Sequence, residues 1–234
     1  MVGVFNRPAG PESRRYPAVL FLHGFPGSEK NVDIQRELLK RGVASFSLHF
    51  AGAWGSEGYY RVSALIDEAR AGLKFLKSHD CVDLKRLGVF GFSMGGWTAL
   101  HVGAREPGLR TVVAVAPAGG KEMVVKNLRQ VVAHLSVPLR VKSKADAYRD
   151  FVAAVRAHDP AQSAARLGGS LLLVHGTADT VIHPAVSARI FASAPQPKKL
   201  VRAQGARHDF LDRREWLTRL VADWFCETLP VRRG

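Results

Sequence analysis

A glycine-flanked serine at residues 91–95, Gly-Phe-Ser-Met-Gly, constrains the fold of this chain more than any other feature. The apolar run 87–90 before it has the composition of a buried strand, and residues 96–104 after it have the composition of a helix. A serine between a strand and a helix must occupy a sharp turn, and glycines two positions to either side leave room for the neighbouring backbone. The pattern predicts an α/β fold in which Ser93 projects above a sheet.

Two further segments place an acid and a histidine just after strands. Asp179 lies beyond the apolar run 171–176, and His208 lies in the loop after residues 199–203, which alternate like a strand. A hydroxyl is a weak nucleophile until a base takes its proton, and an acid can orient that base. We therefore expect Ser93 as the nucleophile, His208 as the general base and Asp179 as the orienting acid. The plainer alternatives are a helix cap for Ser93, a turn residue for Asp179 and a surface loop histidine for His208.

The order serine, acid, histidine resembles that of the α/β-hydrolase superfamily. The chain is similar to small dienelactone-hydrolase-like and feruloyl-esterase-like enzymes, and to the catalytic domains of prolyl-oligopeptidase-like serine peptidases. Residues 23–27, His-Gly-Phe-Pro-Gly, resemble the family loop that supplies one oxyanion-hole amide. The resemblance implies an oxyanion hole formed by the backbone amides of Phe25 and Met94, with His23 as structural support. Dienelactone hydrolases proper use a cysteine nucleophile, so Ser93 argues against that activity.

Alternating strand-like and helix-like segments predict one α/β-hydrolase domain over residues 1–234, with a mostly parallel sheet and helices on both faces. Residues 118–169 interrupt the alternation, and long structureless loops are rare in compact domains. Two helix-like stretches within this segment, 122–134 and 145–158, predict a small helical cap insertion over the site. The expected strands are 2–5, 18–22, 43–50, 87–90, 111–116, 171–176 and 199–203, the first of them antiparallel. The expected helices outside the cap are 33–41, 62–78, 96–104 and 214–227.

The chain carries a formal net charge of +14, from 34 basic and 20 acidic residues. Neutralisation of phosphates drives nucleic-acid binding, but no basic tract is interleaved with aromatic residues, so we expect no nucleic-acid partner. The cap segment 118–169 holds nine basic and four acidic side chains, a net charge of +5. This surplus favours attraction of an anionic substrate, or reflects solubility alone.

No apolar run approaches the roughly 18 residues that a membrane span needs, and residues 1–8 lack the pattern of a signal peptide. We therefore expect a cytoplasmic protein without membrane association. The two cysteines, Cys81 and Cys226, have neither a disulfide framework nor a metal-binding spacing. The histidines form no spaced pair typical of a metal site. Acyl transfer through a serine needs no cofactor, and we expect none.

The leading functional hypothesis is a serine hydrolase that cleaves carboxylic esters of small or medium acyl groups through an acyl-enzyme. The first alternative is a peptidase or amidase of the prolyl-oligopeptidase-like branch, and the second is a non-catalytic binding protein on the same fold. Trp54, Tyr59 and Tyr60 are candidates to line the acyl pocket, with ordinary loop packing as the alternative. The expected partner is a small-molecule ester, and a homodimer stays open.

Overall fold

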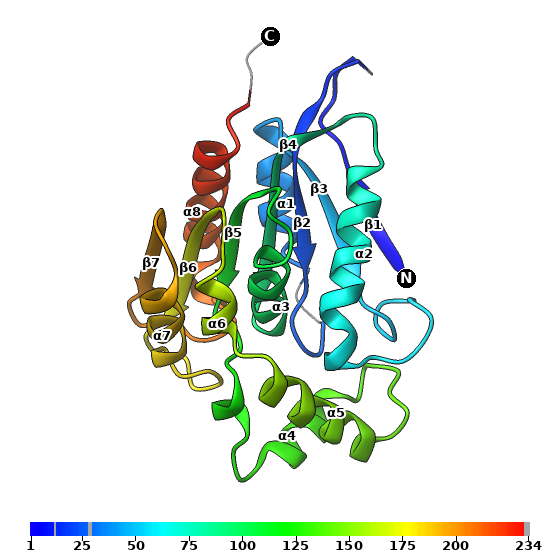
Figure 1. The fold of residues 1–234 in the computed structure, drawn as a ribbon, viewed down its shortest axis with the longest axis vertical. Helices are drawn as coiled ribbons and strands as arrows, with labels where there is room; N and C mark the ends of the chain where they lie inside the picture. Colours follow the sequence, from blue (N-terminus) through cyan, green and yellow to red (C-terminus); the bar gives the residue numbers. More distant parts are fainter. Residues whose placement is uncertain (12, 28–29, 232–234) are drawn as a thin grey trace.

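A seven-stranded sheet forms the centre of the molecule in the computed structural model, which describes residues 1–11, 13–27 and 30–231 (Figure 1). The strand order is β1-β3-β2-β4-β5-β6-β7, and every neighbouring pair is parallel except β1 with β3. The expected α/β-hydrolase fold and the antiparallel first strand are thus confirmed. The strands are β1 Val2–Asn6, β2 Tyr16–Leu22, β3 Ala44–His49, β4 Val82–Phe92, β5 Leu109–Val115, β6 Ser170–Gly176 and β7 Lys198–Ala203.

Both faces of the sheet are buried, which explains why its central strands are continuous apolar runs. Successive side chains of a strand point to opposite faces. In β2, for example, Leu20 packs in the cluster with α2 and α3, while Val19 packs in the cluster with α1 and α8. The helices of the first face are α2 Leu65–Lys77, α3 Met94–Gly103 and α7 Ala185–Ser193, and those of the second are α1 Val32–Lys40 and α8 Arg214–Thr228.

Helices α4 Leu128–Leu135 and α5 Lys144–Ala157 lie beyond the carboxyl ends of the parallel strands (Figure 1). The prediction of a single helix over 122–134 is wrong. Lys121–Met123 forms a short 3-10 turn, and Val124 then leaves helical geometry with φ −84° and ψ 83°. A new helix starts only at Leu128. The short helix α6 Pro160–Ala164 leads back to the sheet.

Two sets of contacts fasten this helical segment to the rest of the domain. The Arg189 guanidinium on α7 contacts Asp159 at 2.8 Å and Glu122 at 2.5 Å. The backbone of Arg140 pairs with the loop after β3, since its amide donates to Gly52 O and its carbonyl accepts from Tyr60 N, each at 2.8 Å. The segment is therefore held on two sides, over the ends of strands that carry the candidate residues.

Candidate active site

Ser93 lies in the sharp turn between β4 and α3, in a backbone conformation that side chains rarely adopt: φ is 55° and ψ is −118°. The turn is possible because of its flanking glycines. A Cβ on Gly91 would lie 2.0 Å from Gly95 O, and a Cβ on Gly95 would lie 2.1 Å from Leu22 O. A hydrogen bond to the neighbouring strand β5 also holds the turn, since Ser93 N donates to Val115 O at 2.8 Å. The packing of β4, α3 and β2 thus forces the serine outward.

The structure brings the three predicted residues into one hydrogen-bonded chain. His208 Nε2 lies 3.2 Å from Ser93 Oγ, and His208 Nδ1 lies 2.7 Å from Asp179 Oδ2. A carboxylate can only accept, so Nδ1 carries the ring proton and the Nε2 lone pair faces the serine hydroxyl. This is the arrangement in which imidazole can remove the hydroxyl proton.

Asp179 is fully saturated with hydrogen-bond donors. Its Oδ1 accepts from the amides of Val181 at 2.8 Å and Ile182 at 2.9 Å, while Oδ2 faces His208 and also lies 3.2 Å from His175 Nε2. Burial opposes ionisation, but the contacts with the two histidines outweigh it and hold the pKa of Asp179 well below its usual value. Asp179, the acid that contacts His208, is therefore ionised at neutral pH. The neighbouring Asp209 instead accepts from the amide of Leu211.

The loops that carry Asp179 and His208 are joined to each other by their backbones. Thr177 N donates to Ala203 O at 3.0 Å, and Ala178 N donates to Ala206 O at 3.1 Å. Gly176 permits this close approach, because a Cβ there would lie 2.2 Å from Ala206 O. The geometry of the acid and the base is thus set by the ends of β6 and β7.

The loop after β2 lies against the serine, as expected from the family resemblance. A Cβ on Gly24 would lie 3.1 Å from the Cβ of Ser93. His23 fixes this loop, since its Nδ1 donates to Gly24 O at 2.8 Å and its Nε2 accepts from Phe50 N at 3.2 Å. Burial lowers the pKa of His23 to about 4, so the ring stays neutral. Within the described part of the chain, the amides of Phe25 and Met94 donate to no acceptor.

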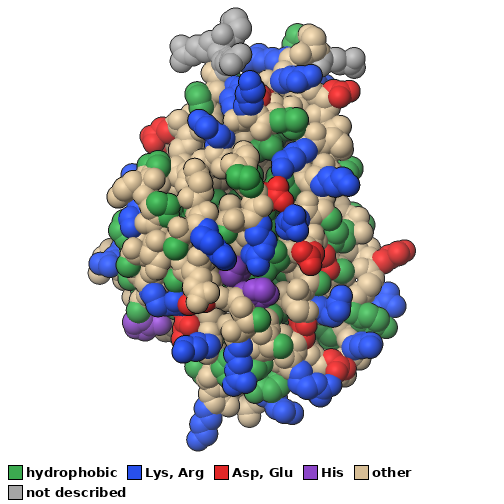
Figure 2. Space-filling model, viewed as in Figure 1, with side chains coloured by type: hydrophobic (Ala, Val, Ile, Leu, Met, Phe, Trp, Pro, Cys, Tyr) green, Lys and Arg blue, Asp and Glu red, His purple; other side chains and the backbone are tan. Residues whose placement is uncertain are grey.

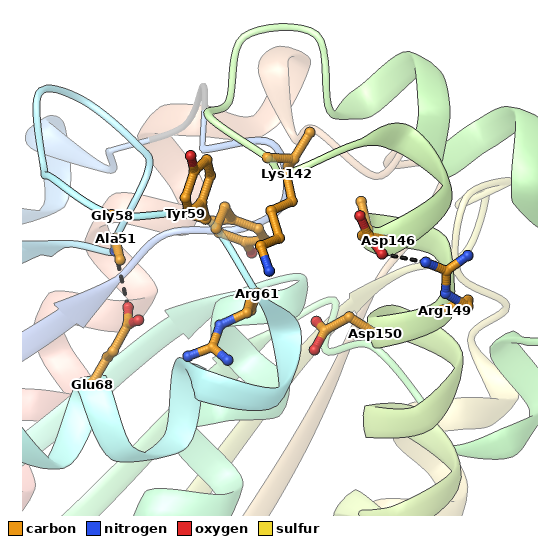
Figure 3. A pocket seen from close by; sticks show the side chains of 12 residues that line it. Ala51, Gly58, Tyr59, Arg61, Glu68, Lys142, Asp146, Arg149 and Asp150 are labelled. Carbon is orange, nitrogen blue, oxygen red and sulfur yellow. Dashed lines mark hydrogen bonds and ion pairs between the residues drawn. The ribbon is translucent and has the colours of Figure 1, made fainter.

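A cavity of about 600 Å³ opens between the loop after β3 and the start of α5 (Figure 3). Tyr59 and Tyr60 line it, but Ser93 and His208 do not. Tyr60 also contacts the loop after β2, because its ring stacks on that of Phe25 with centroids 5.4 Å apart. The third candidate, Trp54, is not part of the lining. Its indole donates to Gly27 O at 2.5 Å and Lys30 lies over its ring, contacts that fit the loop-packing alternative.

The charges in this cavity are balanced. Its acids are already engaged: Glu68 accepts from Ala51 N and Asp146 pairs with Arg149 (Figure 3). Asp150 accepts from the amide and the hydroxyl of Ser63. Around the rest of the visible surface, Lys and Arg side chains are scattered among acidic and apolar ones rather than gathered in one patch (Figure 2). The net charge of the cap segment is therefore not concentrated at this opening. The basic lining residues are Arg61, Lys142 and Arg149, and the acidic ones are Glu68, Asp146 and Asp150.

The described residues contain no group of three or more His, Cys, Asp or Glu side chains placed to hold a metal ion. In the same part of the chain, Cys81 and Cys226 are both free thiols. A search of those residues for a helix both long and apolar enough to cross a bilayer found none.

The model of the prolyl oligopeptidase family matches residues 41–231, a span that contains Ser93, Asp179 and His208. The chain belongs to the prolyl oligopeptidase family. Among curated proteins it is similar to an uncharacterized protein of Mycobacterium tuberculosis, at 25% identity over 194 residues, which cover 82% of this chain and 63% of that protein. The chain thus spans less than two thirds of the length of this relative. Bovine dipeptidyl peptidase 4 is 28% identical over 198 residues, covering 78% of this chain and 25% of the peptidase.

Among solved structures, the fold is similar to that of Est1E from Butyrivibrio proteoclasticus with ferulic acid bound. The TM-score is 0.79 at 19% identity, and the match covers 98% of this chain and 96% of Est1E. At this identity the likeness shows a common fold. Together with the family match, it identifies the chain as a member of the prolyl oligopeptidase family with the α/β-hydrolase fold.

Proposed function

We propose that this family member hydrolyses carboxylic esters of small or medium acyl groups, with Ser93 as the nucleophile, His208 as the general base and Asp179 as the orienting acid. The observation that carries the proposal is the continuous chain from Ser93 Oγ through His208 to the Asp179 carboxylate, at 3.2 Å and 2.7 Å. These are distances at which a proton can pass from the hydroxyl to the imidazole as the serine attacks.

The reaction has two halves with the same machinery. Ser93 Oγ bonds to the acyl carbon, its proton passes to His208 Nε2, and the imidazolium then gives that proton to the departing alkoxide. In the second half, water attacks the acyl-enzyme and gives its proton to His208 Nε2. The imidazolium then returns that proton to Ser93 Oγ as the carboxylic acid leaves. In each half the carbonyl oxygen becomes negatively charged, and the amides of Phe25 and Met94, which lack acceptors among the described residues, would bind it. Loss of one such donor typically costs about 3–4 kcal/mol of transition-state stabilisation.

The size of the region that covers the serine favours small or medium acyl groups. The cap segment contains only short helices, of which α5 with 14 residues is the longest. The adjacent cavity of about 600 Å³ falls within the usual range for a small-molecule site. Est1E, which has the same fold, binds ferulic acid, a compact aromatic acid. Tyr59 and Tyr60 would contact the acyl or the alcohol group at the edge of this cavity.

Peptide or amide hydrolysis is the second candidate, because bovine dipeptidyl peptidase 4 is a family relative. The two functions are separated by a matched substrate panel: p-nitrophenyl esters of acetate, butyrate and palmitate against p-nitroanilides of single amino acids and dipeptides, with Ser93→Ala as the blank. We expect the short esters to have the highest kcat/KM. Faster cleavage of the anilides would overturn the ester proposal and leave the serine chemistry intact.

A further inference from the structure

His175, at the end of β6, is a buried histidine in contact with the proposed acid, and the mechanism above does not use it. Its side chain is 1% exposed. Its Nδ1 lies 2.7 Å from Ser187 Oγ on α7, and its Nε2 lies 2.9 Å from Ile182 O and 3.2 Å from Asp179 Oδ2. The ring therefore links α7 to the turn 179–182 that carries the acid.

These partners determine where the proton of the ring lies. The Ile182 carbonyl and the Asp179 carboxylate are both acceptors, so the Nε2 atom that faces them must carry a proton. The Ser187 hydroxyl, itself fully buried, can then donate to the lone pair of Nδ1. A neutral ring with its proton on Nε2 satisfies every contact. The N–H donates mainly to Ile182 O and has a longer, secondary contact with the carboxylate.

The position of this N–H matters because Asp179 Oδ2 is the same oxygen that accepts from His208 Nδ1. Oδ1 is held by the backbone amides of the 179–182 turn, and His175 holds that turn through Ile182 O. His175 thus fixes the acid twice, directly at Oδ2 and indirectly through the turn. Without it, Oδ2 would keep one donor, and Ile182 O would lose the hydrogen bond that ties the turn through this ring to Ser187 on α7.

We propose that His175 is a positioning residue for hydrolysis at Ser93: its Nε2–H holds the Asp179 carboxylate in the orientation that His208 needs. The inference rests on the proposed function, because it assigns His175 a role in that same reaction. It adds a fourth residue to the chain, in the order His175, Asp179, His208, Ser93. At metal centres, replacing a residue that orients a ligand by a hydrogen bond typically costs about 10–100-fold in affinity or activity, and we expect a loss of that order here. A misplacement of about 1 Å can cost about 10²-fold in rate.

The test compares two amides at position 175. In His175→Gln the side-chain amide reaches the place of Nε2 and can still donate toward Ile182 and Asp179. In His175→Asn it reaches only the place of Nδ1, near Ser187. His101→Asn is the control, because His101 is another histidine with 1% exposure and a serine partner, Ser163, on another part of the domain. The readouts are kcat and KM for a short ester, the rate of labelling of Ser93 by a fluorophosphonate, and the melting temperature.

We expect His175→Asn to lower kcat and the labelling rate by about 10–100-fold with KM within about twofold, because the effect falls on the chemical step. His175→Gln should retain kcat within about threefold, and His101→Asn should lower the melting temperature without lowering kcat. If His175→Asn fails to fold, His175→Met, which fills the space of Gln without a donor, takes its place.

Two results would overturn the inference. One is wild-type kcat in a folded His175→Asn or His175→Met variant. The other is an equal loss in the Gln variant and in the Asn or Met variant, which has no donor at the place of Nε2, since the donated hydrogen bond would then be irrelevant. Failure of the proposed function is recognised separately, because the wild-type protein itself would then neither hydrolyse the ester nor react with the probe.

Discussion

Two buried histidines, His23 and His101, should make the folded protein sensitive to mild acid. Burial lowers the pKa of His23 from 6.5 to about 4 and that of His101 from 6.5 to about 3. Below about pH 6.5 these two imidazoles are therefore protonated in the unfolded chain but stay neutral in the folded one. The free energy of unfolding consequently falls as the pH falls. Their contribution to stability is fully present above the unfolded pKa of 6.5 and is lost progressively toward the folded values.

The size of the effect follows from these shifts. At pH 5, each histidine is almost fully protonated in the unfolded chain and almost fully neutral in the folded one, which costs about 2 kcal/mol per site relative to neutral pH. The two sites together cost about 4 kcal/mol. Native domains are stable by roughly 5–15 kcal/mol in total. A loss of this size would therefore lower the urea midpoint strongly.

The assay is urea unfolding followed by fluorescence at pH 7, 6 and 5, with the free energy of unfolding extrapolated to zero urea. His101→Asn should lower the pH dependence by about 2 kcal/mol between pH 7 and pH 5, whatever it does to stability at pH 7. The contribution of His23 would remain, together with those of His49 and His158, whose pKa values burial also lowers. The exposed His134 provides the control, and His134→Gln should leave the pH dependence as it is. A free energy of unfolding that changes by less than about 1 kcal/mol between pH 7 and pH 5 would refute the reasoning.

Three further predictions concern the site itself. Asp179→Asn should lower kcat by about 10⁴-fold with the fold intact, because an amide stabilises the wrong imidazole tautomer; a larger loss in Asp209→Asn would show that the acid is misassigned. Gly95→Ala should give little folded protein, because its Cβ would lie 2.1 Å from Leu22 O, and normal thermal unfolding of this variant would count against the tight turn at Ser93. A carboxylate-bearing ester should react no faster than its neutral analogue at either low or physiological salt, because the charges of the adjacent cavity are balanced; a salt-sensitive advantage would instead support attraction by the basic cap segment.

The fold and the positions of Ser93, Asp179 and His208 could be predicted from the sequence, because each follows from the succession of apolar runs and loops along the chain. Apolar runs buried on both faces mark the strands, and Ser93, Asp179 and His208 each follow a strand end. Parallel strands bring such ends to one edge of the sheet. The position of the loop at Phe25 beside Ser93 could be predicted from family resemblance but not from periodicity.

The features that were missed depend on side-chain direction and on contacts between distant segments. Nothing in the pattern near residue 54 indicates that Trp54 packs on Gly27 and Lys30 rather than lining a cavity. The contact of His175 with Asp179 depends on the turn geometry of residues 179–182, which the sequence pattern does not specify. The interruption of the helix between Met123 and Leu128 could not be predicted, because residues 122–134 have a helix-like composition throughout.

The identity of the nucleophile is tested most directly by covalent labelling. A fluorophosphonate probe should react with the native protein at one site, and peptide mass spectrometry should place the adduct on Ser93. The heat-denatured protein and Ser93→Ala, which should melt near the wild-type temperature, should both stay unlabelled. An adduct on another residue, or no adduct on protein shown to be folded, would contradict the assignment of Ser93 and with it the hydrolytic mechanism.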